Sequence, residues 1–96
     1  MTTFDLLRQK RRQILAITAK HGVTSIRVFG SVARQEDSGG SDVDFLVTTG
    51  PKTSSWFPAG LVLDLEALLG RRVEVVTENG LNPLIRDHVL AETVAL

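Results

Sequence analysis

Apolar residues in the first part of the chain recur at the spacing of an amphipathic helix. One stripe of this helix is apolar, with Phe4, Leu7, Ile14 and Ile17. Much of the remaining surface is basic, with Arg8, Lys10, Arg11 and Arg12. The pattern predicts one helix over residues 3–21. Thr2 or Thr3 suits its N-cap. Asp5 lies favourably against the helix dipole, and Gly22 ends the helix.

Three short segments have the composition and alternation of strands. Residues 24–29 form the first, and residues 73–77 form the third. The second covers residues 42–48. Its apolar face carries Val43, Phe45 and Val47, and its other face carries Asp42, Asp44 and Leu46.

The second half of the chain contains two further helix patterns. A loop over residues 49–58 leads into a predicted helix over 57–69, whose apolar register holds Phe57, Leu61, Leu65 and Leu68. Gly70 ends it. Asn82-Pro83 suits the start of a last helix, which is expected to run to about residue 95. Helices alternating with strands predict an α/β sandwich around a small sheet, with one domain over residues 1–96.

Composition and charge exclude several classes of function. The 11 basic and 11 acidic residues cancel, which argues against direct nucleic-acid binding and against adhesion to an acidic membrane. The basic residues of the first helix therefore fit a solvated face better than a nucleic-acid patch. The absence of cysteine excludes disulfides and thiolate chemistry. Without a signal-peptide pattern or a long apolar run, we expect a cytoplasmic protein.

Asp42 and Asp44 are the first candidates for chemistry. At positions i and i+2 of a strand, both side chains point to one face, with Cα atoms about 6.5–7 Å apart. Two such carboxylates repel each other unless a cation lies between them, and carboxylate oxygens suit Mg²⁺. The alternative is an exposed edge strand whose outward residues are acidic.

Glu74 is the third acidic candidate. It shares a strand face with Val76, just as Asp44 shares one with Leu46. If the two strands are neighbours, Glu74 joins the aspartates in one acidic corner, and the two apolar residues lie under a helix. Three carboxylates on adjacent strands are typical of two-metal phosphoryl transfer.

Gly30-Ser31 follows the first strand and turns the chain, and a short helix is expected to begin near the serine. Glycine lets backbone amides approach a ligand closely, and the start of a helix offers free N–H groups to phosphate. An ordinary turn with a serine N-cap is the alternative. The chain has neither a Walker-type phosphate loop nor a dinucleotide-binding fingerprint.

Together these pieces resemble the signature of the DNA polymerase β-type nucleotidyltransferases. The resemblance rests on Gly30-Ser31, on Arg34 three residues after the serine, and on Ser41-Asp42-Val43-Asp44. The chain is most similar to the minimal nucleotidyltransferase branch, whose typical blocks it also carries over residues 68–77 and 82–92.

This resemblance implies a fold, a site and a partner. The fold is the minimal polymerase β-like nucleotidyltransferase fold, of α/β (α+β) class, with a small mixed sheet flanked by helices. Gly30 and Ser31 are expected to hold the phosphates of ATP, and Asp42 and Asp44 to hold two Mg²⁺ ions. Glu74 is expected to activate the attacking hydroxyl or to help bind the catalytic metal. Members of the branch commonly neutralise a HEPN-type ribonuclease toxin encoded beside them, by transferring AMP from ATP to a tyrosine of that toxin.

Two positions depart from the family pattern. Gln35 stands where glycine is usual, and it costs of order 1 kcal/mol if the backbone there needs a positive φ. Glu74 stands where aspartate is usual and is one methylene longer. It can still ligate Mg²⁺, and the expected site remains active.

Two alternative functions follow from the same residues. In one, the protein is an antitoxin that neutralises its partner by contact alone. In the other, it is a transferase for a small molecule such as an aminoglycoside, enclosed in a homo- or hetero-oligomer. The first would function without Asp42 and Asp44, whereas both enzyme hypotheses require them.

Other residues near the motifs have two roles open to them. Arg34 binds triphosphate or pairs with Glu36 or Asp37. Ser41 binds phosphate or caps its loop.

Farther from the motifs, Trp56 stacks on adenine or, together with Phe57, staples a helix start. Arg71 and Arg72 steer ATP or extend along the surface at a strand start. His21 and His88 are not expected to act in catalysis.

Overall fold

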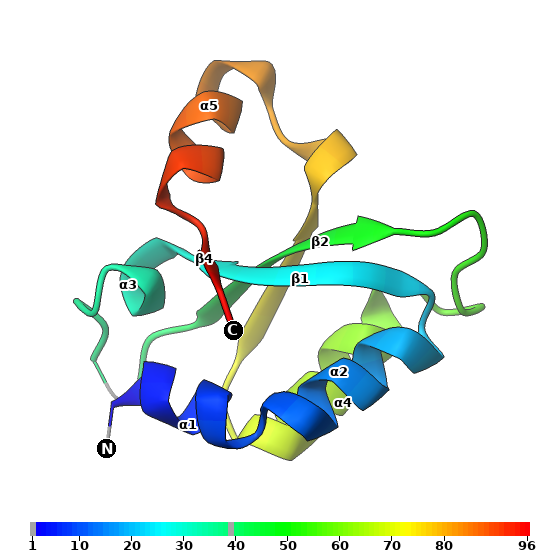
Figure 1. The fold of residues 1–96 in the computed structure, drawn as a ribbon, viewed down its shortest axis with the longest axis horizontal. Helices are drawn as coiled ribbons and strands as arrows, with labels where there is room; N and C mark the ends of the chain where they lie inside the picture. The colour runs from blue at the N-terminus through cyan, green and yellow to red at the C-terminus, as the bar shows by residue number, and fades with distance from the viewer. Residues whose placement is uncertain (1, 39) are drawn as a thin grey trace.

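The computed structural model describes residues 2–38 and 40–96; Met1 and Gly39 lie outside them (Figure 1). Its elements in chain order are α1 (Thr3–Gln9), α2 (Arg11–Lys20), β1 (Val23–Phe29), α3 (Gly30–Ala33), β2 (Val43–Thr49), α4 (Ala59–Leu69), β3 (Val73–Thr77), the 3-10 helix η1 (Glu78–Gly80), α5 (Pro83–Glu92) and β4 (Val94–Ala95).

The strands form one mixed sheet in the order β3-β2-β1-β4. β2 and β3 are parallel, whereas β1 is antiparallel to both β2 and β4. Helices α1, α2 and α4 lie on one side of the sheet, and α5 lies on the other (Figure 1). This confirms the α+β class with a small mixed sheet flanked by helices.

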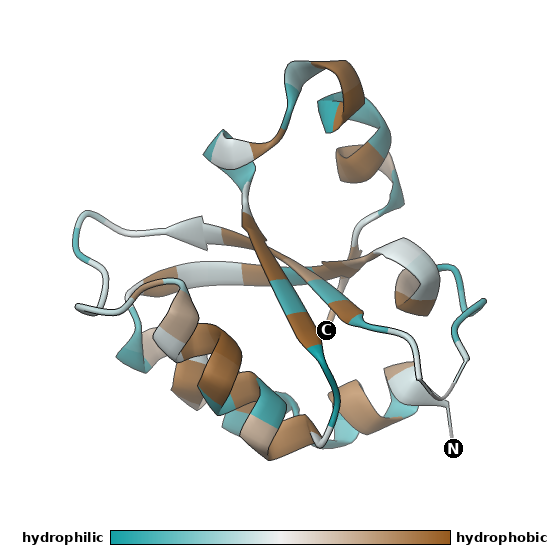
Figure 2. Ribbon diagram, turned by 180° about the vertical axis from the view of Figure 1, so that it is seen from behind, coloured by the Kyte–Doolittle hydropathy of each residue, from teal (hydrophilic) through white to brown (hydrophobic). Residues whose placement is uncertain are grey.

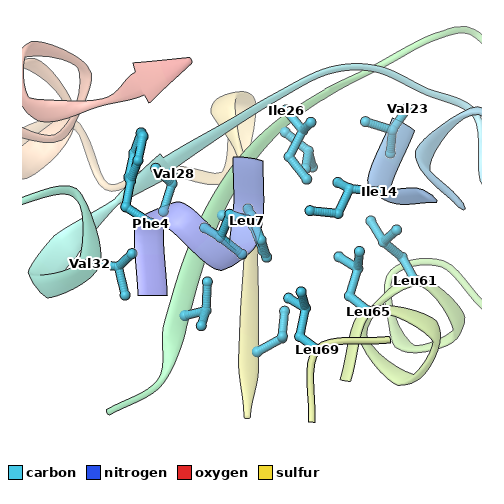
Figure 3. Close-up of a cluster of buried hydrophobic side chains, with 14 residues drawn as sticks. Phe4, Leu7, Ile14, Val23, Ile26, Val28, Val32, Leu61, Leu65 and Leu69 are labelled. Carbon is cyan, nitrogen blue, oxygen red and sulfur yellow. The ribbon is translucent and has the colours of Figure 1, made fainter. Parts of the chain in front are cut away.

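The main core lies between the sheet and the layer of α1, α2 and α4 (Figure 3). Val43, Phe45 and Val47 of β2 face this core, as their alternation predicts. Helix α4 is hydrophobic along most of its length and packs here too (Figure 2). Leu46 instead joins a second, smaller cluster with Leu81 and Val89, on the side of α5.

The predicted helix over 3–21 is wrong in one respect, because two helices meet at Lys10. The backbone of Lys10 (φ −99°, ψ 15°) ends α1 and begins α2. Six consecutive polar residues separate Leu7 from Ile14, so the break removes no apolar side chain from the core. The apolar stripe is otherwise confirmed, and Thr2 caps α1 in a capping box with Asp5.

Two other helix boundaries also differ from the prediction. The last helix ends at Glu92 and not near residue 95, because Thr93 is extended and Val94–Ala95 pair with β1 as β4. β-Branched residues favour this extended conformation. The helix predicted over 57–69 begins at Ala59, since Pro58 occupies its N-cap; its end at Gly70 is confirmed. Within the described ranges, no helix has the length and apolar character needed to cross a membrane.

A buried histidine joins three segments at the end of β1 that lies away from Gly30. His21 contacts Ser54 Oγ through Nδ1 at 2.5 Å and Asp64 Oδ2 through Nε2 at 2.7 Å. These contacts tie the end of α2 to the loop before α4 and to α4 itself. These contacts give His21 a structural role.

Candidate active site

The parallel pairing of β2 with β3 brings two acidic residues side by side. Asp44 is the register partner of Glu74, and two residues further along Leu46 is the partner of Val76. The two strands are therefore neighbours, as the three-carboxylate hypothesis requires. Both change from acidic to apolar along the same face, and Leu46 and Val76 belong to the cluster beneath α5. Asp42 lies one residue before β2 and is exposed.

Burial and repulsion together raise the pKa of the Asp44 carboxyl. Partial burial, followed by the charge of Glu74, a hydrogen bond with Glu74 and the charge of Asp42, raises the pKa of Asp44 to about 6. The charge of Arg34 opposes this shift but does not cancel it. The site thus gathers negative charge at the start of two neighbouring strands.

These carboxylates are chemically suited to Mg²⁺, a hard cation that prefers oxygen ligands. The raised pKa of Asp44 is the observation that fits a cation, since a positive ion would relieve its repulsion with Glu74 and Asp42. Among residues 2–38 and 40–96, no three acidic or histidine side chains are grouped closely enough to hold a metal. The convergence of all three carboxylates on a metal therefore stays a prediction.

Gly30 lies against the Asp44 carboxylate, so it brings the Gly30-Ser31 turn to the acidic pair. Its φ is +72°, and a Cβ on its backbone would collide with the carboxylate of Asp44. Glycine is therefore needed both for the backbone conformation and for the close approach. Ser31 follows it in α3, so Gly30-Ser31 and Asp44 lie together although 13 residues separate Gly30 from Asp44 in the sequence.

Glu92, at the end of α5, binds this glycine and the nearby arginine. The N–H of Gly30 donates to Glu92 Oε1 at 3.1 Å. Arg34 Nη1 donates to both carboxylate oxygens of Glu92, at 3.2 and 3.1 Å, and Arg34 Nε donates to Glu36 at 3.1 Å. Of the partners expected for Arg34, Glu36 is confirmed, whereas Asp37 accepts a hydrogen bond from Thr3 instead. No pattern in the sequence signals Glu92 as a partner of Arg34.

A second arginine anchors the loop that precedes Asp42. Arg71 Nη2 donates to the Ser41 carbonyl at 2.6 Å and to the Ser38 carbonyl at 3.4 Å, and its Nη1 donates to Thr3 Oγ1 at 2.9 Å. Ser41 Oγ in turn accepts from the Ser38 N–H at 3.0 Å, so it caps the loop. The side chain of Arg71 is only 16% exposed, so it does not extend along the surface.

The remaining candidates are placed as follows. Gln35 has a φ of 57° and thus pays the left-handed cost of about 1 kcal/mol. Trp56 is 79% exposed and lies near His21, at the end of β1 opposite Gly30, so its position does not favour adenine stacking. Its neighbour Phe57 packs against the main core. His88 is exposed on α5, with Nε2 3.7 Å from Glu92.

A small cavity of about 110 Å³ lies on the α5 side of the sheet, around Leu46 and Thr48 of β2. Its lining comprises Ser25, Arg27, Leu46, Thr48, Glu78 and Leu90. Pockets that enclose drug-sized ligands are typically about 300–1,000 Å³, so this cavity is too small to enclose a nucleotide.

Comparison with known proteins identifies the family. A family model of the nucleotidyltransferase domain matches residues 10–96. The protein adenylyltransferase MntA of Thermococcus cleftensis is 43% identical over 75 residues, covering 78% of this chain and 76% of that protein. A Methanocaldococcus jannaschii protein named "putative protein adenylyltransferase" is 42% identical over 84 residues, covering 88% of this chain and 90% of that protein.

Solved structures agree with this assignment. That of a "putative minimal nucleotidyltransferase" has a TM-score of 0.86 at 44% identity, over 100% of this chain and 97% of that one. A toxin–antitoxin structure with AMP-PNP has a TM-score of 0.73 at 17% identity, over 88% of this chain and 69% of that one, which is a likeness of fold alone. The chain therefore belongs to the nucleotidyltransferase family, in its minimal branch, and is an enzyme of that class.

We expect Asp44→Asn to stabilise the metal-free protein at neutral pH. The carboxyl has a pKa of about 6 when folded and an ordinary value of 3.8, so the folded state holds this proton more tightly, and its stability falls as the pH rises from about 4 to 6. Asparagine removes that cost. After allowance for solvent screening, the variant should gain about 1 kcal/mol at pH 7 and almost nothing at pH 4.

Urea unfolding in EDTA at pH 4, 5, 6 and 7 measures this difference. Asp87→Asn, which removes the same charge from an exposed position on α5, is the matched control. A gain that does not vary with pH would contradict the assignment of the cost to Asp44.

We expect Arg71→Lys to loosen the loop that positions Asp42. Lysine keeps the charge but cannot bridge Ser41 and Thr3 at once, so the free energy of unfolding should fall by about 1 kcal/mol. Hydrogen exchange at the amides of residues 40–43 should accelerate in parallel. The exposed neighbour Arg72, changed to lysine, should alter stability by less than about 0.5 kcal/mol. Equal exchange rates in the two variants would show that Arg71 does not position the loop.

Proposed function

We propose that this enzyme is an Mg²⁺-dependent protein adenylyltransferase that acts as an antitoxin in the cytoplasm. It transfers AMP from ATP to a tyrosine of a HEPN-type ribonuclease toxin. The observation that carries the proposal is the meeting of Gly30-Ser31 with the Asp44–Glu74 pair. The names of the two relatives at 42% and 43% identity support protein adenylylation. Residues 1–96 act as one nucleotidyltransferase domain in this proposal.

The proposed site divides the work between two groups of residues. Gly30 and Ser31, with Arg34 and Ser41 nearby, hold the phosphates. Asp42, Asp44 and Glu74 would hold two Mg²⁺ ions. When bound, these ions would neutralise charge on the phosphates and make the attacking oxygen a better nucleophile. Positioning and charge stabilisation account for most of catalysis in phosphoryl transfer, so this short set of residues is chemically sufficient.

The transfer itself exchanges one P–O bond for another. The tyrosine Oη bonds to the α-phosphorus of ATP, the bond from that phosphorus to the β-phosphate oxygen breaks, and pyrophosphate leaves. The phenolic proton moves to the carboxylate of Glu74, which is the exposed member of the Asp44–Glu74 pair. The longer side chain of Glu74 relative to aspartate brings its oxygen farther from the strand.

The acceptor tyrosine is placed by docking of the whole partner over the acidic corner. Holding two reactants in register supplies roughly 7–11 kcal/mol of barrier reduction. The cavity on the α5 side of the sheet, at about 110 Å³, is too small to enclose an acceptor and a nucleotide. A hetero-oligomer with the toxin is therefore the working form of the enzyme.

We expect Asp42→Asn or Asp44→Asn to reduce AMP transfer at least about a hundredfold while the fold is kept, because each removes a charged ligand from the site. AMP incorporation by mass spectrometry and the melting temperature are measured on the same samples. Asp87→Asn is again the control and should transfer AMP like the wild type. Transfer retained in either site variant would exclude that aspartate as an essential ligand.

We also expect the enzyme to modify its encoded neighbour and little else. The purified protein is incubated with Mg-ATP and either that neighbour, an unrelated tyrosine-rich protein or an aminoglycoside. The added mass of AMP on a tyrosine of the encoded neighbour, and on neither of the other two acceptors, supports the proposal. Efficient turnover of the aminoglycoside would favour the small-molecule transferase, and neutralisation of the neighbour without any transfer would favour the contact antitoxin.

A further inference from the structure

Glu92 occupies a position that the proposed function assigns to a phosphate. Its side chain is only 18% exposed, and it accepts hydrogen bonds from the Gly30 N–H and from Arg34. A backbone amide and a guanidinium are also the donors that bind phosphate oxygens most strongly. The Glu92 carboxylate is thus an internal anion on donors expected to serve the nucleotide.

The charge around Gly30 prevents Glu92 and a polyphosphate from sharing these donors. The amide of Gly30 faces Glu92, while its Cα packs against the Asp44 carboxylate. A polyphosphate that approached with Glu92 in place would meet negative charge on both sides, and bound Mg²⁺ would neutralise only the side of Asp44. Like charges at such distances are costly in a partly buried site.

Helix α5 has the means to release this carboxylate. Glu92 is its last residue, whereas Val89 and Leu90, one turn earlier, hold the helix on the apolar cluster. Thr93 and the two-residue strand β4 follow directly. A rotation of the Glu92 side chain therefore frees Gly30 and Arg34 without unpacking α5.

We propose that Glu92 is a resident competitor of the nucleotide: it holds Gly30 and Arg34 in the empty enzyme and is displaced by the polyphosphate of ATP. This inference rests on the proposed function, because it takes Gly30 and Arg34 to be phosphate ligands. In consequence, the affinity for ATP is lowered by the fraction of molecules in which Glu92 occupies the donors.

Glu92→Gln tests the competition directly. The amide keeps an oxygen for the Gly30 N–H but loses the charge that holds Arg34. If Glu92 occupies its donors for most of the time, the variant should bind inorganic tripolyphosphate roughly three- to tenfold more tightly in calorimetry. Glu36→Gln removes a charge from the same guanidinium without touching Gly30, and it should change the affinity less than twofold.

The amide resonance of Gly30 supplies a second readout. In ¹H–¹⁵N spectra of the wild type it should move on addition of tripolyphosphate, as Glu92 is replaced. If Glu92→Gln does not fold, Glu92→Asp serves instead, because the shorter side chain cannot reach both donors and should also tighten binding.

The outcomes separate this inference from the proposed function. Binding of Mg-ATP by the wild type, with equal or weaker tripolyphosphate binding in Glu92→Gln, would overturn the competition and leave the function standing. A Gly30 resonance that does not move while Mg-ATP binds would do the same. Failure of the wild type and of the variant to bind either Mg-ATP or tripolyphosphate would overturn both.

Discussion

The in-register parallel pairing of β2 with β3 is the contact on which the site and both apolar clusters depend. One register sets Asp44 beside Glu74, Leu46 beside Val76 and Phe45 beside Val75. The first pair makes the acidic corner, the second lies under α5, and the third faces the main core. Since strand faces alternate with a period of two, a single set of backbone hydrogen bonds fixes the acidic and the packing positions together.

The acidic corner is tolerated by the fold and is not a source of its stability. The raised pKa of Asp44 expresses the cost of its partial burial and then its repulsion with Glu74 and Asp42, which the apolar clusters must offset. Around this corner, two arginines hold backbone and side chains in place: Arg71 fixes the loop before Asp42, and Arg34 joins α3 to the end of α5. The site is thus a region of negative charge, and the two arginines beside it bind the loop and the helix ends that surround it.

The sequence predicted the parts of the molecule that depend on local pattern. The alternation along residues 42–48 correctly separated the two faces of β2. The match between Asp44-Leu46 and Glu74-Val76 placed Glu74 beside the aspartates on the condition that the strands are neighbours, and that condition is met. It could not predict individual side-chain hydrogen bonds that no pattern along either segment marks. Arg34 and Glu92 are 58 positions apart, and Arg71 and Ser41 are 30 apart. Likewise, β4 forms because the edge of β1 is open to pairing, and no pattern within residues 93–96 indicates that such an edge is present.

The alternation of Glu74 with packing residues along β3 restricts which changes of strand length this chain can tolerate in evolution. An insertion or deletion of one residue within β3 ahead of Glu74 would turn the carboxylate to the other face. It would also turn Val76 away from α5 and Val75 away from the main core. Such a change would remove the fold together with the chemistry. Related chains should therefore keep the length of this strand and differ along it by exchange of side chains.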